Sequence, residues 1–331
     1  MKNKLAIASA FVAASSFSTA EIVINDFLSF EGFIDMSYTH TDIEDGGVSS
    51  SDNSYQIDQV EVALLFDFDV VTGQIDIDAE DDNGTNNGSD LEELEIEQAF
   101  AAYHFGNGGV FIAGRFASML GFEAFEPTGL YQYSFAYDIG FLPGYSQGVK
   151  YSYETDTTFF GIALLDEAFD TDGNRFGGSG DSSYAIEVAG SINVGNGLTW
   201  FLGGAYEDAD VGDAYAVNTY ATFETGAWIF AAEVSFGEQE ALVGDDIEAI
   251  NALIMANFAY SDQASVTGRI SYEDFDAGVG GELDYFKYTL AHGYAFSDNL
   301  SMVTEVSFID GEDTDVDFDG LAAALELIFA Y

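Results

Sequence analysis

The side chains in this sequence that could do chemistry are almost all carboxylates. The 331 residues include 59 Asp and Glu against 7 Lys and Arg, with three histidines and no cysteine. This composition leaves little for transition-metal binding or nucleophilic catalysis, and no Ser/His/Asp spacing stands out. The acidity also argues against nucleic-acid binding, which requires clusters of Lys and Arg to neutralise phosphates. We therefore expect neither an enzyme nor a nucleic-acid-binding protein.

The elements that must position these carboxylates are strands with two unlike faces. Val60, Val62 and Leu64 alternate with Gln59 and Glu61, and such alternation predicts a strand with one apolar and one polar face. Sixteen segments of this kind follow one another, and their connections alternate between short and long. Their approximate ranges are 27–40, 54–70, 71–82, 91–105, 109–117, 146–155, 157–166, 183–194, 198–207, 214–225, 226–236, 248–260, 262–275, 283–296, 298–309 and 318–331.

This series predicts an all-β fold, an antiparallel up-and-down barrel that spans a membrane. So many consecutive strands would leave two long edges in an open sheet, and closure removes them. In such a barrel the apolar faces meet lipid and the acids line a wet lumen. An even number of strands places both termini on the short-turn, periplasmic side. A secreted acidic β-sandwich, whose apolar face packs inward, remains an alternative.

The first twenty residues predict a cleavable export signal. Lys2 and Lys4 precede an apolar stretch from Leu5 to Phe17, and small residues lead to a cleavage point after Ala20. This order of charged, apolar and small residues is typical of signal peptides. A membrane anchor would need about 20 apolar residues. We expect residues 21–331 to form the barrel.

The polar faces supply the candidate residues of a lumen. The predicted lumen acids are Glu61, Asp76, Asp78, Glu93, Glu95 and Glu97. Four basic residues are assigned to the same side, where charge is tolerated and tunes selectivity: Arg115, Lys150, Arg269 and Lys287. For Arg115 the assignment depends on alternation, which places it opposite the apolar Ile112 and Phe116.

The connection over residues 117–145 is the longest and is unusually rich in apolar residues. We favour a loop that folds into the barrel and narrows the pore, since a solvent-facing loop has no reason to be so apolar. A lid on the rim, or further strand pairing near residues 130–140, is the alternative. The infolded loop would bring Glu123, Glu126 and Asp138 to a constriction.

The four bases have two possible roles at that constriction. They could oppose the loop acids and set up a transverse field, or they could neutralise neighbouring acids and hold the loop down. The second role is preferred for Arg115 and Lys150, which flank the loop. Both roles stay open for Arg269 and Lys287, which lie eight predicted strands further round.

Three short motifs resemble those of a known family. They are Gly114-Arg115-Phe116, Gly121-Phe122-Glu123 and Gly148-Val149-Lys150-Tyr151. Their sequence resembles the β-barrel porins of the OmpL-like kind, and the sixteen-strand plan with a long third loop is similar to general trimeric porins of Gram-negative bacteria. The resemblance implies passive diffusion of small hydrophilic solutes. The scarcity of bases departs from the arginine ladder of general porins.

Together these features predict an outer-membrane porin of a Gram-negative bacterium. Because lumen acids outnumber lumen bases, we expect a preference for cations. A barrel plugged by its long loop, with a structural or adhesive role and little conductance, is the alternative. The expected partners are outer-membrane lipid and lipopolysaccharide, the barrel-assembly machinery through the strand ending at Tyr331, and, by resemblance, further copies of the chain in a homotrimer.

No cofactor is expected, although acidic outer connections could bind Ca²⁺ or Mg²⁺ loosely together with lipopolysaccharide. These connections span residues 41–53, 81–90 and 309–319. Asp170, Asp172 and Asn174 also resemble the start of a calcium loop, but Arg175 stands where such loops carry glycine. That departure counts against a site of the EF-hand type.

Overall fold

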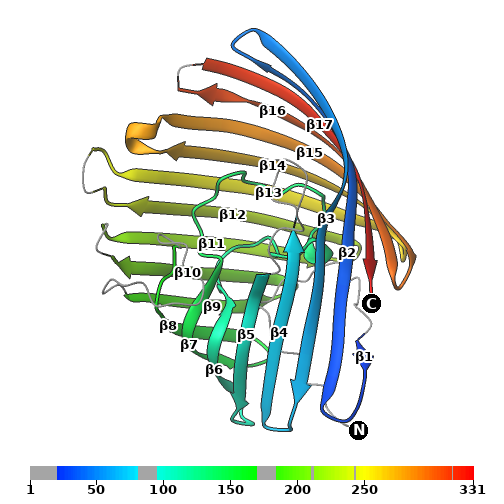
Figure 1. The fold of residues 1–331 in the computed structure, drawn as a ribbon, viewed down its shortest axis with the longest axis vertical. Coiled ribbons are helices and arrows are strands. Elements are labelled where there is room, and N and C mark those ends of the chain that lie inside the picture. The colour runs from blue at the N-terminus through cyan, green and yellow to red at the C-terminus, as the bar shows by residue number, and fades with distance from the viewer. Residues whose placement is uncertain (1–20, 81–94, 170–183, 210–211, 242–243, 315) are drawn as a thin grey trace.

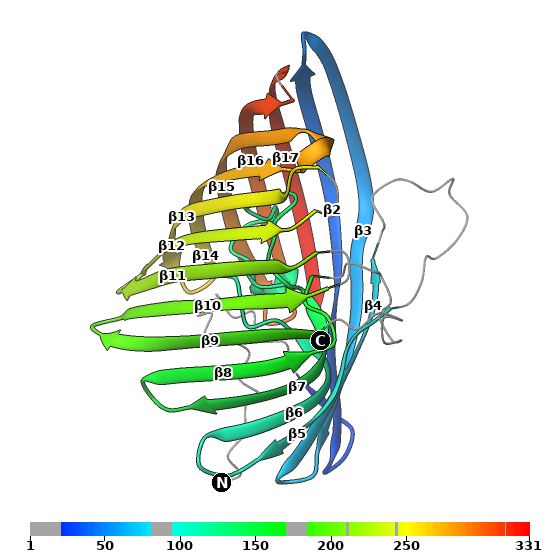
Figure 2. The ribbon, with the colours of Figure 1, turned by 90° about the vertical axis from the view of Figure 1, so that its left-hand side faces the viewer.

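The computed structural model describes residues 21–80, 95–169, 184–209, 212–241, 244–314 and 316–331. Within these residues the strands form one closed antiparallel sheet, shown from two sides in Figures 1 and 2. Each long strand pairs with its neighbours in sequence, and the last pairs with the first long strand to close the ring. The predicted sixteen-strand barrel is therefore confirmed. The β-sandwich alternative is wrong, because the sheet is single and closed.

The two-residue strand β1 (Ile22–Val23) adds to the edge of the first long strand. The barrel strands are β2 (Leu28–Asp45), β3 (Val48–Asp67), β4 (Val71–Glu80), β5 (Glu95–His104), β6 (Gly109–Ala117), β7 (Tyr145–Glu154), β8 (Thr158–Leu165), β9 (Tyr184–Gly195), β10 (Leu198–Asp208), β11 (Ala214–Thr225), β12 (Trp228–Gln239), β13 (Ile247–Ser261), β14 (Ala264–Asp276), β15 (Glu282–Ser297), β16 (Leu300–Asp313) and β17 (Val316–Ala330). Two short 3₁₀ turns, η1 (Pro127–Gly129) and η2 (Gly278–Gly280), complete the described elements. None of the helical segments in the described ranges is long and apolar enough to cross a membrane.

Both ends of the described chain lie at the rim that carries the short turns. The oxygen of Phe27 accepts a hydrogen bond from the Asp67 nitrogen beside the β3–β4 turn. At the other end, Asn299 of the β15–β16 turn donates its side-chain amide to the Ala330 oxygen at 2.8 Å. The predicted placement of the termini is thus confirmed.

Two predicted outer loops are strands instead. β2 and β3 continue through the predicted loop 41–53 and are joined by Gly46 and Gly47 alone, both with positive φ. Positive φ at both central residues is what a type I′ hairpin turn requires. β16 and β17 likewise extend through most of residues 309–319. The prediction failed because these polar extensions carry no apolar alternation, whereas main-chain pairing does not need it.

The walls alternate as the sequence predicted. In β13 the buried residues Asn251, Leu253 and Met255 alternate with Ile250 and Ile254, which are 42% and 57% exposed. A face of exposed isoleucine opposite a buried, partly polar face suits lipid outside and protein or water inside. The barrel therefore turns its apolar side outward.

Exposed aromatic residues gather toward the short-turn ends of the strands. Tyr103 lies edge-on to Phe105 with ring centroids 5.0 Å apart, and Tyr294 does the same with Phe296 at 5.1 Å. Aromatic side chains at this height form the interfacial girdles of membrane barrels.

Candidate functional site

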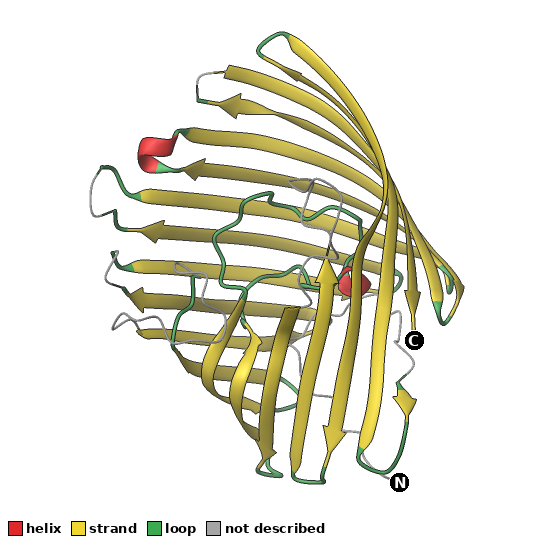
Figure 3. Ribbon diagram, viewed as in Figure 1, coloured by secondary structure: helices red, strands yellow, loops and turns green. Residues whose placement is uncertain are grey.

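The connection between β6 and β7, residues 118–144, crosses the inside of the barrel (Figures 1 and 3). We call it the interior loop. Its main chain reaches inward-facing side chains far round the wall: Phe122 donates its amide to Glu233 of β12 at 2.7 Å, and Tyr133 donates its amide to Glu305 of β16 at 2.8 Å. The loop is therefore attached to the strands opposite its own stem as well as to its neighbours.

The first part of the interior loop packs its apolar side chains onto the wall. Met119, Leu120 and Phe122 are 3–4% exposed and join one buried cluster with Phe201 and Tyr220. The wall makes room with glycine: a Cβ at Gly203 would overlap the Leu120 side chain. Close packing of this kind fixes the position of the loop.

Glutamates of the wall hold the loop by its backbone. Glu187 of β9 accepts from the Met119 amide at 2.5 Å and the Ser118 hydroxyl at 2.9 Å. Glu273 of β14 accepts from consecutive amides, those of Asp138 at 2.8 Å and Gly140 at 2.7 Å among them. A carboxylate that accepts several backbone N–H groups makes strong, charge-assisted hydrogen bonds.

Two of the predicted bases bind the loop from the opposite wall. Arg269 of β14 donates to Glu123 at 2.6 Å, to the Ser134 oxygen at 2.7 Å and to the Phe135 oxygen at 2.9 Å. Its side chain is fully buried. The guanidinium therefore bonds one loop carboxylate and two loop carbonyl oxygens, and its positive charge is not accessible to solvent.

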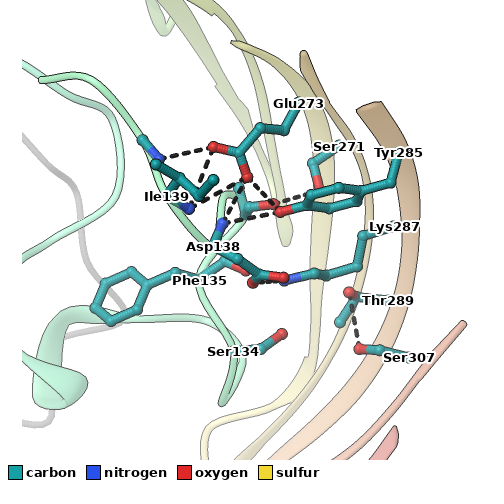
Figure 4. A network of polar contacts seen from close by, with 12 residues as sticks. Ser134, Phe135, Asp138, Ile139, Ser271, Glu273, Tyr285, Lys287, Thr289 and Ser307 are labelled. Carbon is teal, nitrogen blue, oxygen red and sulfur yellow. Dashed lines mark hydrogen bonds and ion pairs between the residues drawn. The ribbon is translucent and has the colours of Figure 1, made fainter. Parts of the chain in front are cut away.

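Lys287 of β15 is held in the same way next to it (Figure 4). Its Nζ lies 2.5 Å from Asp138 and 3.1 Å from the Phe135 oxygen. The Lys287 side chain is 3% exposed, whereas that of Asp138 is 54% exposed. In this ion pair the carboxylate of Asp138 is exposed and the ammonium of Lys287 is buried.

The other two predicted bases lie at the stem of the loop. Lys150 of β7 donates to the Ala117 oxygen at 3.2 Å and lies 4.3 Å from the Phe116 ring centre. Arg115 of β6 donates through Nε to the Glu97 oxygen at 2.9 Å. These contacts tie neighbouring strand ends together.

The faces assigned to Ile112 and Phe116, on which the prediction for Arg115 rested, are wrong. Ile112 and Phe116, expected to face lipid, are buried in the cluster that receives the interior loop, whereas Phe111 is 41% exposed. An apolar side chain on the inner face is stable here because the loop covers it. The alternation rule assumes a wet lumen and therefore fails where the lumen is filled by protein.

Tyrosines of the interior loop add neutral hydrogen bonds. Burial, aided by the charge of Asp58, raises the pKa of Tyr133 to about 12 despite its contact with Ser37 at 3.2 Å. Burial and then Glu233 raise the pKa of Tyr137 well above its ordinary value, and its hydroxyl lies 3.3 Å from that carboxylate. Both hydroxyls therefore stay protonated at neutral pH.

The predicted lumen acids are found on one side of the interior. Glu61, Asp76 and Asp78 are 7%, 1% and 2% exposed. Glu95 and Glu97 begin β5, where the register shifts between Asp76, which pairs with Gln98, and Ile77, which pairs with Ile96, so that Glu97 is an extra residue of β5. Glu126 of the loop accepts from Gln59 at 3.1 Å and from Tyr145 at 3.0 Å. The predicted residues Glu93, Asp170, Asp172 and Asn174 lie outside the described residues.

Sequence reasoning missed the wall glutamates that hold the loops. They are Glu187, Glu207, Glu233, Glu273 and Glu305. A usable signal existed, because each stands at an inward position within its strand, as Glu187 does between Ala185 and Ala189. An acid enclosed by small residues leaves space for another segment to reach it.

The described interior carries a strong surplus of acid. Its buried charged residues, among those described, comprise ten acids and two bases, and both bases are paired with acids of the loop. Carboxylates therefore outnumber basic groups at the buried positions of the described residues. Nothing in the described part of this arrangement resembles a nucleophile with its base.

A protein family matches most of the chain. The family described as "Putative beta-barrel porin-2, OmpL-like" matches residues 28–325. No protein of curated function matches.

Solved structures of similar shape are outer-membrane proteins. The outer-membrane-expressed OmpT of Vibrio cholerae has a TM-score of 0.65 and 13% identity, covering 94% of this chain and 100% of its own. The outer-membrane channel DcaP of Acinetobacter baumannii has a TM-score of 0.69 and 12% identity, with coverages of 92% and 97%. The anion-selective porin from Comamonas acidovorans has a TM-score of 0.66 and 13% identity, with coverages of 92% and 99%. At such identities the likeness concerns the fold.

Proposed function

Because the chain belongs to the OmpL-like family of beta-barrel porins, which are non-enzymatic channels of the Gram-negative outer membrane, we propose that it lets small hydrophilic solutes diffuse passively and prefers cations. Sixteen strands enclose a space wide enough for an aqueous channel. The interior loop takes up part of that space, and we assign it the role of the constriction. Glu123, Glu126 and Asp138 are its proposed acids. Arg269 and Lys287 are their proposed basic counterparts, and Arg115 and Lys150 are proposed to hold the stem of the loop.

One observation carries the preference for cations. The bases nearest the loop, Arg269 and Lys287, are buried against loop acids and carbonyls, while the Asp138 side chain is 54% exposed. An ion passing this point would meet carboxylate rather than guanidinium or ammonium. The likeness to an anion-selective porin does not argue against this, because selectivity depends on the charges inside the barrel and not on the fold.

A second candidate is a plugged barrel with a structural or adhesive role. The apolar packing of Met119, Leu120 and Phe122 on the wall favours it, since a well-packed loop could close the lumen. Single-channel recording in planar bilayers separates the two functions. Discrete, ohmic current steps support a porin, whereas a purified, folded protein that inserts without measurable steps contradicts it.

The homotrimer is also a proposal. One of the similar structures is a trimer form of OmpT, and the exposed apolar walls of this barrel would suit contact with other copies as well as with lipid. Native mass spectrometry of the detergent-solubilised protein should give three chains per particle. A monomer under conditions that keep the barrel folded contradicts it.

A further inference from the structure

Carboxylates from distant parts of the chain meet beside the stem of the interior loop. One oxygen each of Glu61 on β3, Glu97 on β5 and Glu126 on the loop lie within 4.8 Å of one another. Glu97 reaches this place because the register shift between β4 and β5 leaves it as an extra residue. A bulge of this kind re-aims a side chain.

Glu61 is buried beside the other two carboxylates of the cluster. It is 7% exposed, and its Oε2 has no hydrogen-bond partner among the described residues. The contrast with Asp76 on the next strand is clear, because Gln74 and Gln98 both donate their amides to that carboxylate. A buried carboxylate oxygen without a donor is costly unless a proton or a cation satisfies it.

Glu126 is held in place by neutral donors. Gln59 donates to one of its oxygens at 3.1 Å and Tyr145 donates to the other at 3.0 Å. Neither donor carries charge, so they orient the carboxylate without neutralising it. Outer partners of this kind typically fix the ligands of a metal ion.

The positive charge nearby is small. Arg115 donates through Nε to the main-chain oxygen of Glu97, and its guanidinium lies 6.0 Å from the Tyr145 ring centre. Arg269 and Lys287 are paired with other loop acids, and Lys150 binds the Ala117 oxygen. One arginine cannot balance the charge of the whole cluster.

We propose that Glu61, Glu97 and Glu126 bind a divalent cation of the Ca²⁺ type. Calcium bonds oxygen at about 2.3–2.6 Å, so two of its ligands can be about 4.6–5.2 Å apart. Three oxygens within 4.8 Å of one another are compatible with this range. Mg²⁺ bonds at about 2.0–2.1 Å, demands a near-ideal octahedron and keeps several waters, so a cluster of three carboxylates suits it less well. The ion fastens the stem of the loop to the wall, on the side away from Arg269.

Calorimetric titration of the folded, chelator-treated protein with CaCl₂ tests the site. The wild type should bind Ca²⁺ more tightly than Mg²⁺. Glu61→Gln and Glu126→Gln each keep the size of the side chain and remove one charged ligand, so each should weaken Ca²⁺ binding by at least about tenfold. Glu326→Gln is the matched control, because Glu326 is an equally buried wall glutamate outside the cluster, 2% exposed; it should bind as the wild type does.

Binding of Ca²⁺ with unchanged affinity in Glu61→Gln and Glu126→Gln would place the ion at other acids and overturn the site. Absence of Ca²⁺ binding to the wild type would overturn it as well. Heat-modifiable migration on gels verifies that each variant is folded. If Glu61→Gln does not fold, Glu126→Gln decides, because its side chain belongs to the loop and not to the wall. The result is independent of conductance, so it does not depend on the proposed channel function.

Discussion

At the scale of single residues, the interior depends on carboxylates that accept main-chain N–H groups. Four glutamates of the wall each accept a hydrogen bond from at least one backbone amide of the interior loop: Glu187, Glu233, Glu273 and Glu305. Such acids hold the loop through its main chain, without a basic side chain of the loop as their partner. The strongly acidic composition therefore has a structural use as well as an electrostatic one.

Glu273→Ala should loosen the tip of the interior loop. The amides of Ile139 and Gly140 would lose their acceptor, and each unsatisfied group costs about 1–3 kcal/mol. We expect noisier single-channel currents and faster proteolysis within residues 118–144. Glu207→Ala is the control, because Glu207 accepts the amides of Ala168 and Phe169 in the next connection. If both variants change the current noise and the rate of proteolysis equally, Glu273 does not specifically stabilise the interior loop.

Asp138→Asn should weaken the preference for cations. It removes the half-exposed charge paired with Lys287 and leaves the ammonium unneutralised. A unit charge acts on an ion 4 Å away by about 1 kcal/mol in water, so the K⁺/Cl⁻ permeability ratio should fall by roughly fivefold at low salt. Asp69→Asn, on the exposed β3–β4 turn, serves as the control and should leave the ratio unchanged. An unaltered ratio in Asp138→Asn removes Asp138 from the proposed constriction.

At the scale of elements, the sequence predicts strands better than loops. Alternation identified the sixteen barrel strands and the inward face of β3 with Glu61, because one face of each strand meets lipid. It missed the extension of β2 over residues 41–45 and that of β3 over residues 48–53, where polar residues predominate. It also misplaced Ile112 and Phe116, because only the folded loop shows that the lumen is apolar there.

Contacts between distant segments could not be predicted from the sequence, for a physical reason. The bond from Phe122 to Glu233 joins residues 111 positions apart, and no local pattern encodes such a pairing. The wall glutamates could be placed on the inward face, but not matched to particular loop amides.

Gly203→Val should displace the interior loop. Its side chain would occupy the space of Leu120, and overpacking of this kind costs about 1–3 kcal/mol. We expect a lower unfolding temperature and an altered single-channel conductance. Gly268→Val on β14 is the matched control, because a Cβ there meets no atom within 4 Å. If Gly203→Val leaves both quantities as in the wild type, the loop is not seated on this part of the wall.

At the scale of the whole molecule, closure and charge act together. The sheet closes through β17 on β2, and Tyr331 exchanges two main-chain hydrogen bonds of 2.9 Å with Gly32 at the seam. Closure lets the outer face be largely apolar, while ten buried acids and two buried bases stand among the described residues. The export signal in residues 1–20, the contacts with lipopolysaccharide and the recognition of the Tyr331 strand by the assembly machinery stay predictions.

The sign of the reversal potential in a KCl gradient across a planar bilayer shows whether K⁺ or Cl⁻ passes the barrel more readily. With the protein as the only conductor, we expect the sign set by K⁺ as the more permeant ion. We also expect a smaller potential at high salt, because screening weakens the field of the interior acids. A potential of the opposite sign, with Cl⁻ as the more permeant ion, would contradict the proposed preference for cations.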